Sequence, residues 1–459
     1  MNFIGRTEEL NRLKKLYRKD GFGTALIYGR RRVGKSELIK QSIRESGENG
    51  IYYICSESQE QTNVEGLSRI VSEVFGLPKL GFRSISEVLE YIFQRSESEA
   101  FVFVLDEYPY LRNKVEGLDS VLQSFIDRYQ DTSRMKFVLC GSYVEIMKSL
   151  LEQSNPLYGR IDLSVNLRQM DYYESARFYP VFCDEDKVRL YSVFGGIPYY
   201  NRMIDPNLSV RENVIELIAS PDARFIDEVD NYLKTEIAKI ENANEVFDAL
   251  ASGFVKFKDI RDQSHVSSGP ALADTLKKLI SMDVVVKEAP INDASNPRKA
   301  GYYISDNMSR FYFRYIYRFR SQMNVMNPEA FYAHYIESDF ESQYVPNRFE
   351  MLCRQYLIRR NRAGEIDPPF LQIGKYYYDI PEQRKNGEFD VVTEDETGYI
   401  FYEAKFRSKP ITEEMIRREI DQVKNTGLNC YRYGFFSRSG FEAAADPERI
   451  TIGLEEMYR

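Results

Sequence analysis

The sequence has no tryptophan and only two histidines among its 459 residues. His265 and His334 lie far apart, so we expect neither zinc sites of the His-Glu-x-x-His or Cys2His2 kind nor a nuclease centred on histidine. No two of the five cysteines have Cys-x-x-Cys spacing. Most of them lie in apolar surroundings, which is typical of reduced thiols in a reducing compartment. The cysteines are Cys55, Cys140, Cys183, Cys353 and Cys430.

Long apolar runs are missing as well. No segment approaches the ~18–20 apolar residues that a membrane span requires. The first residues, Met1–Glu9, contain no hydrophobic signal core and carry acidic side chains. We therefore expect a cytoplasmic protein that does not associate with membranes. The net charge of −8 argues against a protein that coats nucleic acid, although it permits a local basic groove.

Over residues 1–168 the sequence alternates helices with short apolar strands, which predicts a parallel α/β sheet. The first helix is amphipathic, with Leu10, Leu13 and Leu16 on one face. Five later segments are short and rich in β-branched or aromatic residues, as buried parallel strands are. These predicted strands are 24–28, 51–55, 101–106, 136–140 and 161–167.

Four further segments follow this core. Residues 169–237 predict a helical lid that is broken at Gly195–Pro198, and residues 238–307 predict three helices followed by two strands, the pattern of a winged helix. A helical connector at 308–342 leads to a last α/β domain at 343–459. This division is consistent with the several domains that a chain of this length predicts.

The strongest motif is a phosphate-binding loop that fits G-x4-G-K-S/T. It follows the predicted strand 24–28 and opens a helix at Glu37, which is the structural context such a loop requires. Glycines let backbone N–H groups curl around phosphate oxygens, and the start of the helix adds positive potential. Lys35 would neutralise the β- and γ-phosphates, and the Ser36 hydroxyl would bind Mg²⁺. The loop is Gly29, Arg30, Arg31, Arg32, Val33, Gly34, Lys35 and Ser36.

A second motif supports the first. Five apolar residues, 101–105, are followed by Asp106 and Glu107. A buried strand that ends toward the phosphate-binding loop would bring Asp106 to the Mg²⁺ shell and Glu107 to a water in line with the γ-phosphate. The alternatives are an ordinary glycine-containing turn and a strand that ends in acidic residues by chance. Both motifs together favour ATP binding and hydrolysis.

Three segments make the sequence resemble the archaeal-type ATPases of the AAA+/STAND division of P-loop NTPases. They are 3–10 before the loop, 106–111 at the acidic strand and Gly196-Ile197-Pro198 in the helical region. The resemblance covers residues 1 to about 310. It implies that Phe3, Gly5 and Arg6 lie beside the adenine and that Pro198 touches the base from the lid.

The same resemblance implies two further catalytic residues. Ser142 would be the polar sensor near the γ-phosphate, and Arg160 would occupy the arginine-finger position, which is consistent with a homo-oligomer. The alternatives are that Ser142 is a helix N-cap, that Arg160 is a surface arginine and that Gly195–Pro198 is a plain helix-breaking turn.

The winged-helix segment is compatible both with a structural role and with direct contact with DNA. Its third helix, 269–282, carries only Lys277 and Lys278, and the wing adds Arg298 and Lys299. A helix that reads DNA normally has a denser basic face. A structural role as a lever beside the nucleotide is therefore favoured over direct contact with DNA.

The last domain contains a predicted β-hairpin, 387–392 and 399–405, around a polar turn. Symmetric pairing about this turn would put Asp390 opposite Glu403, and alternation would put Phe389 on the face opposite to Phe401. Opposed carboxylates destabilise a hairpin, so they predict a divalent cation such as Mg²⁺ between them, with Lys405 beside it. The alternative is a solvated face with a Glu388–Lys405 ion pair.

The pattern D-x12-E-x-K, a preceding helix with Glu350 and a following helix with Gln422 resemble the PD-(D/E)xK nuclease fold. The arrangement also resembles the uncharacterised C-terminal domain that often accompanies archaeal-type ATPases. The resemblance implies that Asp390, Glu403 and Lys405 are catalytic, that the first two bind metal and that Glu350 is the helical carboxylate. Phe389 stands where the motif has proline.

The sequence therefore predicts an α/β protein with a P-loop NTPase core, a helical lid, a winged helix and a C-terminal α/β domain like a restriction endonuclease. It would be an Mg²⁺-dependent ATPase coupled to a metal-dependent DNA nuclease. The alternative is an ATP-gated switch without nuclease activity, whose C-terminal domain binds DNA or protein. A small-molecule P-loop kinase is disfavoured, because winged-helix and nuclease-like segments are foreign to that class.

Overall fold

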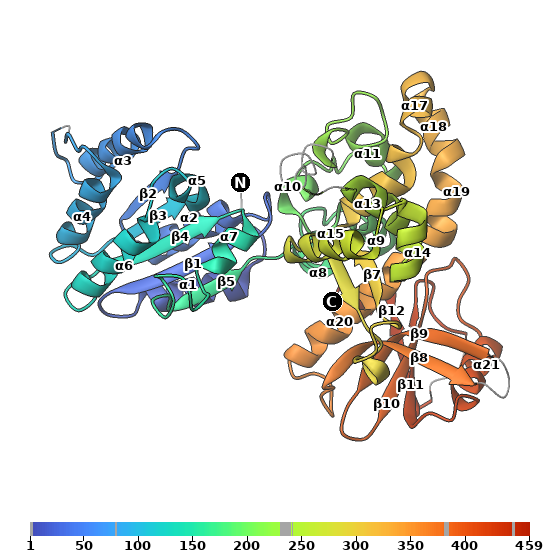
Figure 1. Cartoon of the computed structure of the whole chain (residues 1–459). Helices are drawn as coiled ribbons and strands as arrows, with labels where there is room; N and C mark the ends of the chain where they lie inside the picture. Colours follow the sequence, from blue (N-terminus) through green and yellow to red (C-terminus); the bar gives the residue numbers. More distant parts are fainter. Residues whose placement is uncertain (1–2, 79, 230–239, 241, 381–384, 443–445) are drawn as a thin grey trace. The chain divides into compact units, whose positions relative to one another are not determined.

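The computed structural model describes residues 3–78, 80–229, 240, 242–380, 385–442 and 446–459 (Figure 1). The chain forms two compact units. The first comprises Met1–Gln169 with Ile197–Tyr199, and the second comprises Met170–Gly196 with Tyr200–Arg459. Among the described residues, no helix has the length and apolar character needed to cross a membrane. The division into five domains is not tested by this partition and stays a prediction.

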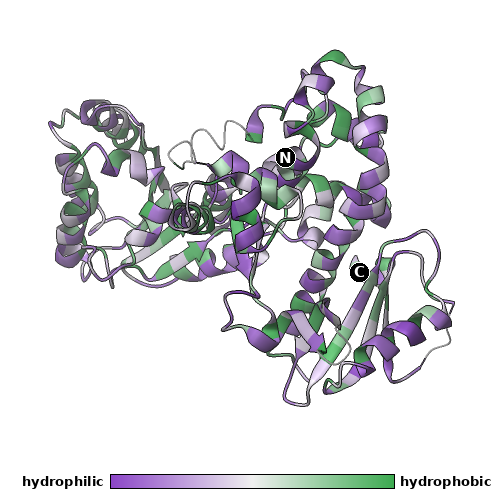
Figure 2. Ribbon diagram, turned by 45° about the vertical axis from the view of Figure 1, so that its right-hand side comes forward, coloured by the Kyte–Doolittle hydropathy of each residue, from purple (hydrophilic) through white to green (hydrophobic). Residues whose placement is uncertain are grey.

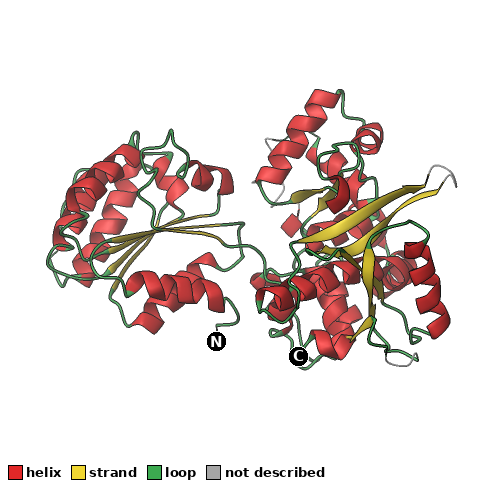
Figure 3. Ribbon diagram, turned by 90° about the horizontal axis from the view of Figure 1, so that it is seen from below, coloured by secondary structure: helices red, strands yellow, loops and turns green. Residues whose placement is uncertain are grey.

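The first unit is built on a parallel sheet with the strand order β2-β3-β4-β1-β5. All five predicted strands are present within a few residues of their expected bounds, and every residue of β1, β3 and β4 is buried. Helices cover both faces of the sheet, which explains why its strands are apolar throughout (Figure 3). The strands are β1 (Gly23–Tyr28), β2 (Gly50–Ile54), β3 (Val102–Asp106), β4 (Lys136–Gly141) and β5 (Leu163–Asn166).

Seven helices of the first unit connect and cover these strands. The first, α1, buries Leu10, Leu13, Leu16 and Tyr17, as its amphipathic pattern predicts. The helices are α1 (Thr7–Tyr17), α2 (Lys35–Ser46), α3 (Glu60–Val74), α4 (Ile85–Arg95), α5 (Tyr108–Arg112), α6 (Leu118–Tyr129) and α7 (Val144–Ser149). Since β1, β4 and β3 are neighbours, the loops after their carboxyl ends meet at one edge of the sheet.

The second unit begins with helices and contains the expected three helices and strand pair. The strands β6 (Val285–Glu288) and β7 (Gly301–Ile304) pair in antiparallel fashion around η2 (Ile291–Asp293). We call β6, η2 and β7 the wing. The helices that precede it are α8 (Tyr172–Ala176), α9 (Asp184–Phe194), α10 (Pro198–Asn201, which begins in the first unit), α11 (Val210–Leu217), α13 (Ala243–Ala251), α14 (Phe257–Ser264) and α15 (Gly269–Ser281).

A run of short helices leads from the wing to the long helix α20 (Val345–Arg362). Two of these segments, η3 and η4, are π-helical. The run consists of α16 (Asn307–Phe311), η3 (Tyr312–Tyr317), α17 (Arg320–Val325), α18 (Pro328–Tyr335), α19 (Glu337–Asp339) and η4 (Phe340–Tyr344).

The C-terminal sheet has the strand order β12-β11-β10-β9-β8. The strands β8, β9 and β10 are antiparallel, and β10, β11 and β12 are parallel. Hydrophobic and hydrophilic residues lie side by side along these strands (Figure 2), and α20 packs on β8, β9 and β10. The elements are β8 (Gln372–Ile380), β9 (Lys385–Glu394), β10 (Tyr399–Lys405), α21 (Glu413–Lys424), β11 (Cys430–Ser437), β12 (Arg449–Gly453) and α22 (Leu454–Met457).

The hairpin β9–β10 has the predicted register, but its alternation is broken. The observed pairs run from Tyr399–Glu394 to Tyr402–Val391, and the pairing of Asp390 with Glu403 stays a prediction. On the other side of β9, the pairing with β8 skips between Gly374–Val392 and Tyr376–Phe389, so β9 contains an extra residue, a β-bulge. The prediction that Phe389 and Phe401 lie on opposite faces is therefore wrong, because their rings are 4.9 Å apart in one apolar cluster.

Candidate functional site

The phosphate-binding loop connects β1 to α2 and depends on glycine at two positions. Gly29 has φ +151°, and a Cβ atom there would lie 2.1 Å from the carbonyl oxygen of Leu167. Gly34 has φ +94° and precedes the first residue of α2. A larger residue at position 29 would push this loop away from β5, so the sequence pattern has a steric cause here.

Lys35 holds the loop together from inside. Its buried ammonium group donates hydrogen bonds to the carbonyl oxygens of Gly29 at 2.8 Å and Arg30 at 3.0 Å, and to the Ser142 hydroxyl at 2.9 Å. These acceptors are two neutral carbonyls and one hydroxyl. The ammonium charge therefore lies inside the curl of the loop without a carboxylate among these hydrogen-bond partners, where a phosphate oxygen would be a stronger acceptor.

Asp106 ends β3 beside the start of α2. Its Oδ2 accepts hydrogen bonds from the Ser36 hydroxyl at 2.6 Å and from the Tyr52 hydroxyl at 2.5 Å, and its Oδ1 accepts the Glu107 N–H at 2.9 Å. A serine hydroxyl next to a buried carboxylate is a donor set that suits Mg²⁺, so the residues present fit that ion.

Tyr52 was not found from the sequence. It lies on β2, which pairs with β3, and its hydroxyl reaches across to Asp106. Burial and then the Asp106 charge raise the pKa of Tyr52, so the phenol stays protonated and donates. The only feature of the sequence that could have indicated Tyr52 is its position near the carboxyl end of β2, the strand next to β3.

Glu107 and Ser142 face each other where β3 and β4 end. The Ser142 hydroxyl donates to Oε1 of Glu107 at 2.6 Å, and the Ser142 N–H donates to Oε2 at 3.1 Å. Glu107 has φ +53°, the left-handed region that non-glycine residues seldom adopt. This backbone conformation and two hydrogen bonds fix the carboxylate beside the ammonium group of Lys35, through the shared serine.

The N-terminal segment and Pro198 both reach the loop. The Arg6 guanidinium is buried and donates to the carbonyl oxygens of Val33 at 3.2 Å and Arg168 at 2.5 Å. Gly5 and Arg6 have φ of +70° and +60°, and Phe3 is half-buried just before them. A Cβ atom on Gly34 would lie 3.9 Å from Cγ of Pro198.

Two of the three loop arginines contact tyrosines. Arg31 donates to the Tyr110 hydroxyl at 2.9 Å and lies 5.7 Å from the Tyr143 ring centre, and Arg32 lies 4.3 Å from the ring centre of Tyr199. Arg30 is half-buried. Val33 is buried in the loop, whereas Glu37 is exposed on α2. Lys35 and Ser36 are the loop residues whose side chains bond to Ser142 and Asp106.

Arg160 is engaged elsewhere in the first unit. Its guanidinium forms a two-pronged ion pair with Asp127 at 2.6 and 2.8 Å and donates to the carbonyl oxygens of Pro156 and Tyr158. The hydrogen bond from Arg160 lowers the pKa of Asp127. Within one chain, the structure therefore joins Arg160 to α6 rather than to the loop residues described above.

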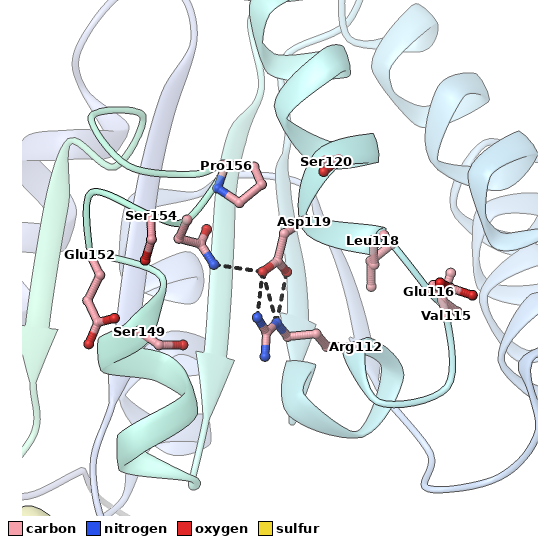
Figure 4. Close-up of a pocket in the computed structure, with 12 residues that line it drawn as sticks. Arg112, Val115, Glu116, Leu118, Asp119, Ser120, Ser149, Glu152, Ser154 and Pro156 are labelled. Carbon is pink, nitrogen blue, oxygen red and sulfur yellow. Dashed lines mark hydrogen bonds and ion pairs between the residues drawn. The ribbon is translucent and has the colours of Figure 1, made fainter.

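A cavity of about 450 Å³ lies between α5, α6 and the segment after α7 (Figure 4). Its buried charge is Asp119, which accepts hydrogen bonds from Arg112 at 2.9 and 3.0 Å, Tyr108 at 2.5 Å and Asn155 at 2.8 Å. Because these partners satisfy Asp119, the cluster fixes α5, which begins directly after Glu107. We interpret it as a support for that residue.

Two of the predicted C-terminal carboxylates, Asp390 and Glu403, are each paired with a lysine. Lys375 of β8 lies 2.7 Å from Asp390, where the bulge widens β9 opposite it. Lys405 lies 2.5 Å from Glu403 and 3.3 Å from Glu419 of α21. Lys375 and Glu419 were not found from the sequence, because neither belongs to the short motif.

The alternative Glu388–Lys405 pair is not formed. Glu388 instead lies 3.2 Å from Lys256, which precedes α14, and 3.5 Å from Lys375. The expected Gln422 donates to the Tyr378 hydroxyl at 3.4 Å. The hairpin charges are thus balanced by residues from other elements.

Burial and mutual repulsion raise the pKa values of two carboxyl groups in the C-terminal domain. Burial and then Asp390 raise the pKa of Glu350 on α20 to about 7. Burial also raises the pKa of Glu403, and Glu419 and Asp390 add to this rise. Among the described residues, no three His, Cys, Asp or Glu side chains gather closely enough to hold a metal ion. The carboxylates therefore form an electrostatic cluster, and two of them at most would share one cation.

Two family models match the chain. Residues 3–204 match a family described as an ATPase domain predominantly from Archaea, and residues 312–420 match a family of archaeal and bacterial proteins of unknown function. The first match contains the phosphate-binding loop, Asp106, Glu107 and Ser142. The second contains Glu350, Asp390, Glu403 and Lys405.

Individual proteins resemble the chain over larger parts. An uncharacterized protein of Methanocaldococcus jannaschii is 26% identical over 465 residues, 99% of this chain and 100% of that protein. The structure of a Walker-type ATPase of Pyrococcus abyssi has a TM-score of 0.51 at 21% identity and covers 68% of this chain and 96% of its own. The structure of the ORC2 protein of Aeropyrum pernix has a TM-score of 0.48 at 16% identity and covers 66% of this chain and 92% of its own.

Proposed function

We propose that the chain is an Mg²⁺-dependent ATPase and that its C-terminal domain is a metal-dependent DNA nuclease, because residues 3–204 match the archaeal ATPase domain. The observation that carries the ATPase chemistry is the joining of Lys35, Asp106, Glu107 and Ser142 at one edge of the parallel sheet. These side chains come from three neighbouring strands, so their arrangement depends on the sheet and not on one flexible loop.

The phosphates of ATP would lie in the loop 29–36. Lys35 exchanges its bonds to carbonyl oxygens for bonds to the β- and γ-phosphates, and backbone N–H groups at the start of α2 donate to phosphate oxygens. Ser36 and Asp106 would hold Mg²⁺, which supplies positive charge to the phosphate oxygens when bound. Phe3, Gly5, Arg6 and Pro198 would border the adenine.

We assign to Glu107 the role of orienting the attacking water or accepting its proton. Each oxygen of this carboxylate accepts one hydrogen bond from Ser142 and keeps a second lone pair, with which it can orient that water or accept its proton. As the polar sensor, Ser142 would turn its hydroxyl from Glu107 toward the γ-phosphate when ATP is bound. Arg160 would complete the site of a neighbouring copy, which requires that it leave Asp127.

Two observations support the nuclease proposal. The order α20, β9–β10 hairpin, α21 and β11 is the one that the PD-(D/E)xK resemblance implies. In addition, Glu350, Asp390 and Glu403 repel one another, so that a divalent cation between Asp390 and Glu403 would relieve charge that the two lysines balance in part. Lys405 would then stabilise charge on the phosphate that is cleaved.

A specific observation favours a structural role for the wing over DNA binding. Arg354 of α20 lies 3.2 Å from Glu288 of β6, Asn292 donates to the carbonyl oxygen of Tyr377 at 2.7 Å, and Lys299 lies 4.1 Å from the centre of the Tyr377 ring. The wing thus packs on the C-terminal sheet, and Lys299, one of the two basic residues that the sequence analysis named on the wing, is used there.

Incubation of the protein with plasmid DNA and Mg²⁺ or Mn²⁺, with and without ATP, tests both parts. We expect cleavage that requires metal and that Asp390→Asn abolishes while leaving ATP hydrolysis intact. Lys35→Ala should abolish hydrolysis, and its effect on cleavage reports whether ATP controls the nuclease. ATP hydrolysis without any DNA cleavage would favour the alternative, an ATP-gated switch that lacks nuclease activity.

A further inference from the structure

Arg31 belongs to the phosphate-binding loop, and two tyrosines from other segments hold its side chain. Its Nη2 donates a hydrogen bond to the Tyr110 hydroxyl at 2.9 Å and lies 3.5 Å from the Tyr143 hydroxyl. Its guanidinium carbon lies 5.7 Å from the centre of the Tyr143 ring, a distance typical of a cation–π contact. These contacts restrict a long side chain that has many rotamers when it is unconstrained.

The two tyrosines closely follow the residues that we assign to hydrolysis. Tyr143 is the residue after Ser142, and Tyr110 lies on α5, the helix that begins directly after Glu107. The Tyr110 N–H donates to the carbonyl oxygen of Glu107 at 3.0 Å. The two rings meet edge to face, with centres 5.8 Å apart and planes at 74°. The segments that carry Glu107 and Ser142 therefore also hold Arg31.

Glu107 and Ser142 indicate which phosphate of ATP would lie near Arg31. Lys35, inside the curl of the loop, donates to the Ser142 hydroxyl at 2.9 Å, and that hydroxyl donates to Glu107 at 2.6 Å. The γ-phosphate that Lys35 would bind therefore faces these two residues, because Glu107 acts on the water that attacks it. The contacts of Arg31 with the segments that follow them put its guanidinium on this side of the loop.

The guanidinium can be reached by a nucleotide in the loop, because Arg31, Tyr110 and Tyr143 are each half-buried. Burial raises the pKa of Tyr110 to about 12, so this phenol stays neutral and leaves the arginine its full charge. Both hydroxyl contacts use Nη2, whereas a guanidinium also carries N–H donors on Nε and Nη1. The tyrosines can therefore hold one nitrogen while the other donors turn toward a phosphate oxygen, which is a stronger acceptor than a phenol.

We propose that Arg31 is a catalytic residue of the ATPase, whose guanidinium contacts the γ-phosphate within the same chain, and that Tyr110 and Tyr143 are positioning residues that hold it. Arg160 does not supply this charge within one chain, because it is paired with Asp127. An arginine that contacts the γ-phosphate accelerates phosphoryl transfer, whether it comes from the same chain or from another.

The arginine would stabilise negative charge during a single displacement. The water oxygen bonds to the γ-phosphorus, and the bond from that phosphorus to the oxygen that bridges it to the β-phosphorus breaks. The products are ADP, inorganic phosphate and the proton that Glu107 accepts. This inference rests on the proposed position of the phosphates in the loop, and it requires no second copy of the chain.

The test separates the γ-phosphate from the rest of the nucleotide. With the full-length chain and Mg²⁺, we would measure steady-state turnover and titrate ADP and a non-hydrolysable ATP analogue. Arg31→Ala should lower kcat by at least about 100-fold and weaken binding of the analogue by about tenfold. ADP, which has no γ-phosphate, should bind as it does to the parent. Arg31→Lys should recover part of the loss, because lysine keeps the charge and loses the fork. Arg44→Gln, exposed at the other end of α2, is the matched control and should behave like the parent.

Tyr110→Phe tests the positioning role, because it keeps the ring and removes the acceptor of the Arg31 hydrogen bond. It should lower kcat by about tenfold without changing the affinity for ADP. In an Arg31→Ala background, Tyr110→Phe should cause no further loss of kcat, because the tyrosine acts through the arginine. If Tyr110→Phe causes the same loss with and without Arg31, the tyrosine does not position the arginine and this part of the proposal is overturned.

The remaining outcomes decide the role of Arg31 itself. Equal kcat in the parent and Arg31→Ala would overturn it, and so would equal losses of affinity for ADP and for the analogue. An effect of Arg31→Ala that appears only at protein concentrations at which copies associate would overturn its action within one chain. If Lys35→Ala bound both nucleotides like the parent, the position of the phosphates would be wrong, whereas loss of binding in Lys35→Ala with a parent-like Arg31→Ala would overturn only the role of Arg31. If Arg31→Ala does not fold, Arg31→Lys and Tyr110→Phe decide by the same comparisons.

Discussion

Ser142 holds both oxygens of the Glu107 carboxylate, with its hydroxyl at 2.6 Å and its backbone N–H at 3.1 Å. The same hydroxyl accepts a hydrogen bond from Lys35 at 2.9 Å. One serine therefore connects the phosphate-binding loop to the residue that would act on water. This connection leads to the first two predictions.

Substitutions in the phosphate-binding loop and at the end of β3 should have different effects on ATP binding and on ATP turnover. Lys35→Ala should weaken ATP binding by about 100-fold, because a charged hydrogen-bond donor is lost. Glu107→Gln should keep binding and slow hydrolysis by about 100-fold, because only the water-directing carboxylate is lost. Nucleotide titration and steady-state turnover measure the two effects, with exposed Glu37→Gln as the control. If Glu107→Gln has the same turnover as the parent, another group orients or deprotonates the water.

Ser142→Ala tests the connection itself. Without the hydroxyl, Lys35 keeps its two carbonyl partners, so ATP affinity should change little, while turnover should fall about tenfold because the γ-phosphate and Glu107 lose a positioning donor. Ser142→Thr keeps a hydroxyl and should recover most of the turnover. If alanine and threonine have the same turnover as the parent, Ser142 acts only through its backbone.

Arg160 and Asp127 test whether copies of the chain complete one another's sites. Their exposed ion pair should contribute less than about 1 kcal/mol to the free energy of unfolding, so neither Arg160→Ala nor Asp127→Ala should unfold the protein. If Arg160 reaches a neighbour, turnover per chain should rise with protein concentration, and Asp127→Ala should enhance that rise by releasing the arginine. Arg160→Ala should remove it. Turnover that is independent of concentration in all three proteins would assign Arg160 to the Asp127 pair alone.

Metal binding in the C-terminal domain should depend on the lysines that accompany the carboxylates. In a Lys35→Ala background, Asp390→Asn should weaken Mn²⁺ binding, whereas Lys375→Ala should strengthen it by about tenfold, because Asp390 loses its competing cation. Lys405→Ala should spare metal binding and lower cleavage. Calorimetric titration gives the affinities. Equal Mn²⁺ affinity in the parent and Asp390→Asn would remove the metal site from this cluster.

Glu350 should make stability depend on pH in a defined direction. Its folded pKa of about 7 lies above the ordinary value of 4.5, so the folded chain holds a proton that the unfolded chain releases. The stabilisation is complete below 4.5 and is lost as the pH rises through about 7. Glu350→Gln should flatten this fall in unfolding temperature, whereas exposed Glu396→Gln on the hairpin turn should not. An unchanged slope in Glu350→Gln would show that Glu350 is ionised throughout.

The sequence by itself determined the first sheet and the phosphate-binding loop. The strand pattern at 24–28 and 101–106 and the loop 29–36 are local, because burial on both faces requires continuous apolar residues and phosphate binding requires glycine and lysine at fixed spacing. The hairpin register followed from the turn as well, because pairing from a short turn leaves Val391 opposite Tyr402.

The tertiary structure alone decided which distant side chains meet. Tyr52 reaches Asp106 from a neighbouring strand, and Lys375 reaches Asp390 across a bulge that breaks the alternation. No spacing along the chain encodes these contacts. They depend on strand order, on one inserted residue in β9 and on helix packing. The free energy of the whole fold determines these features, and no local segment does so alone.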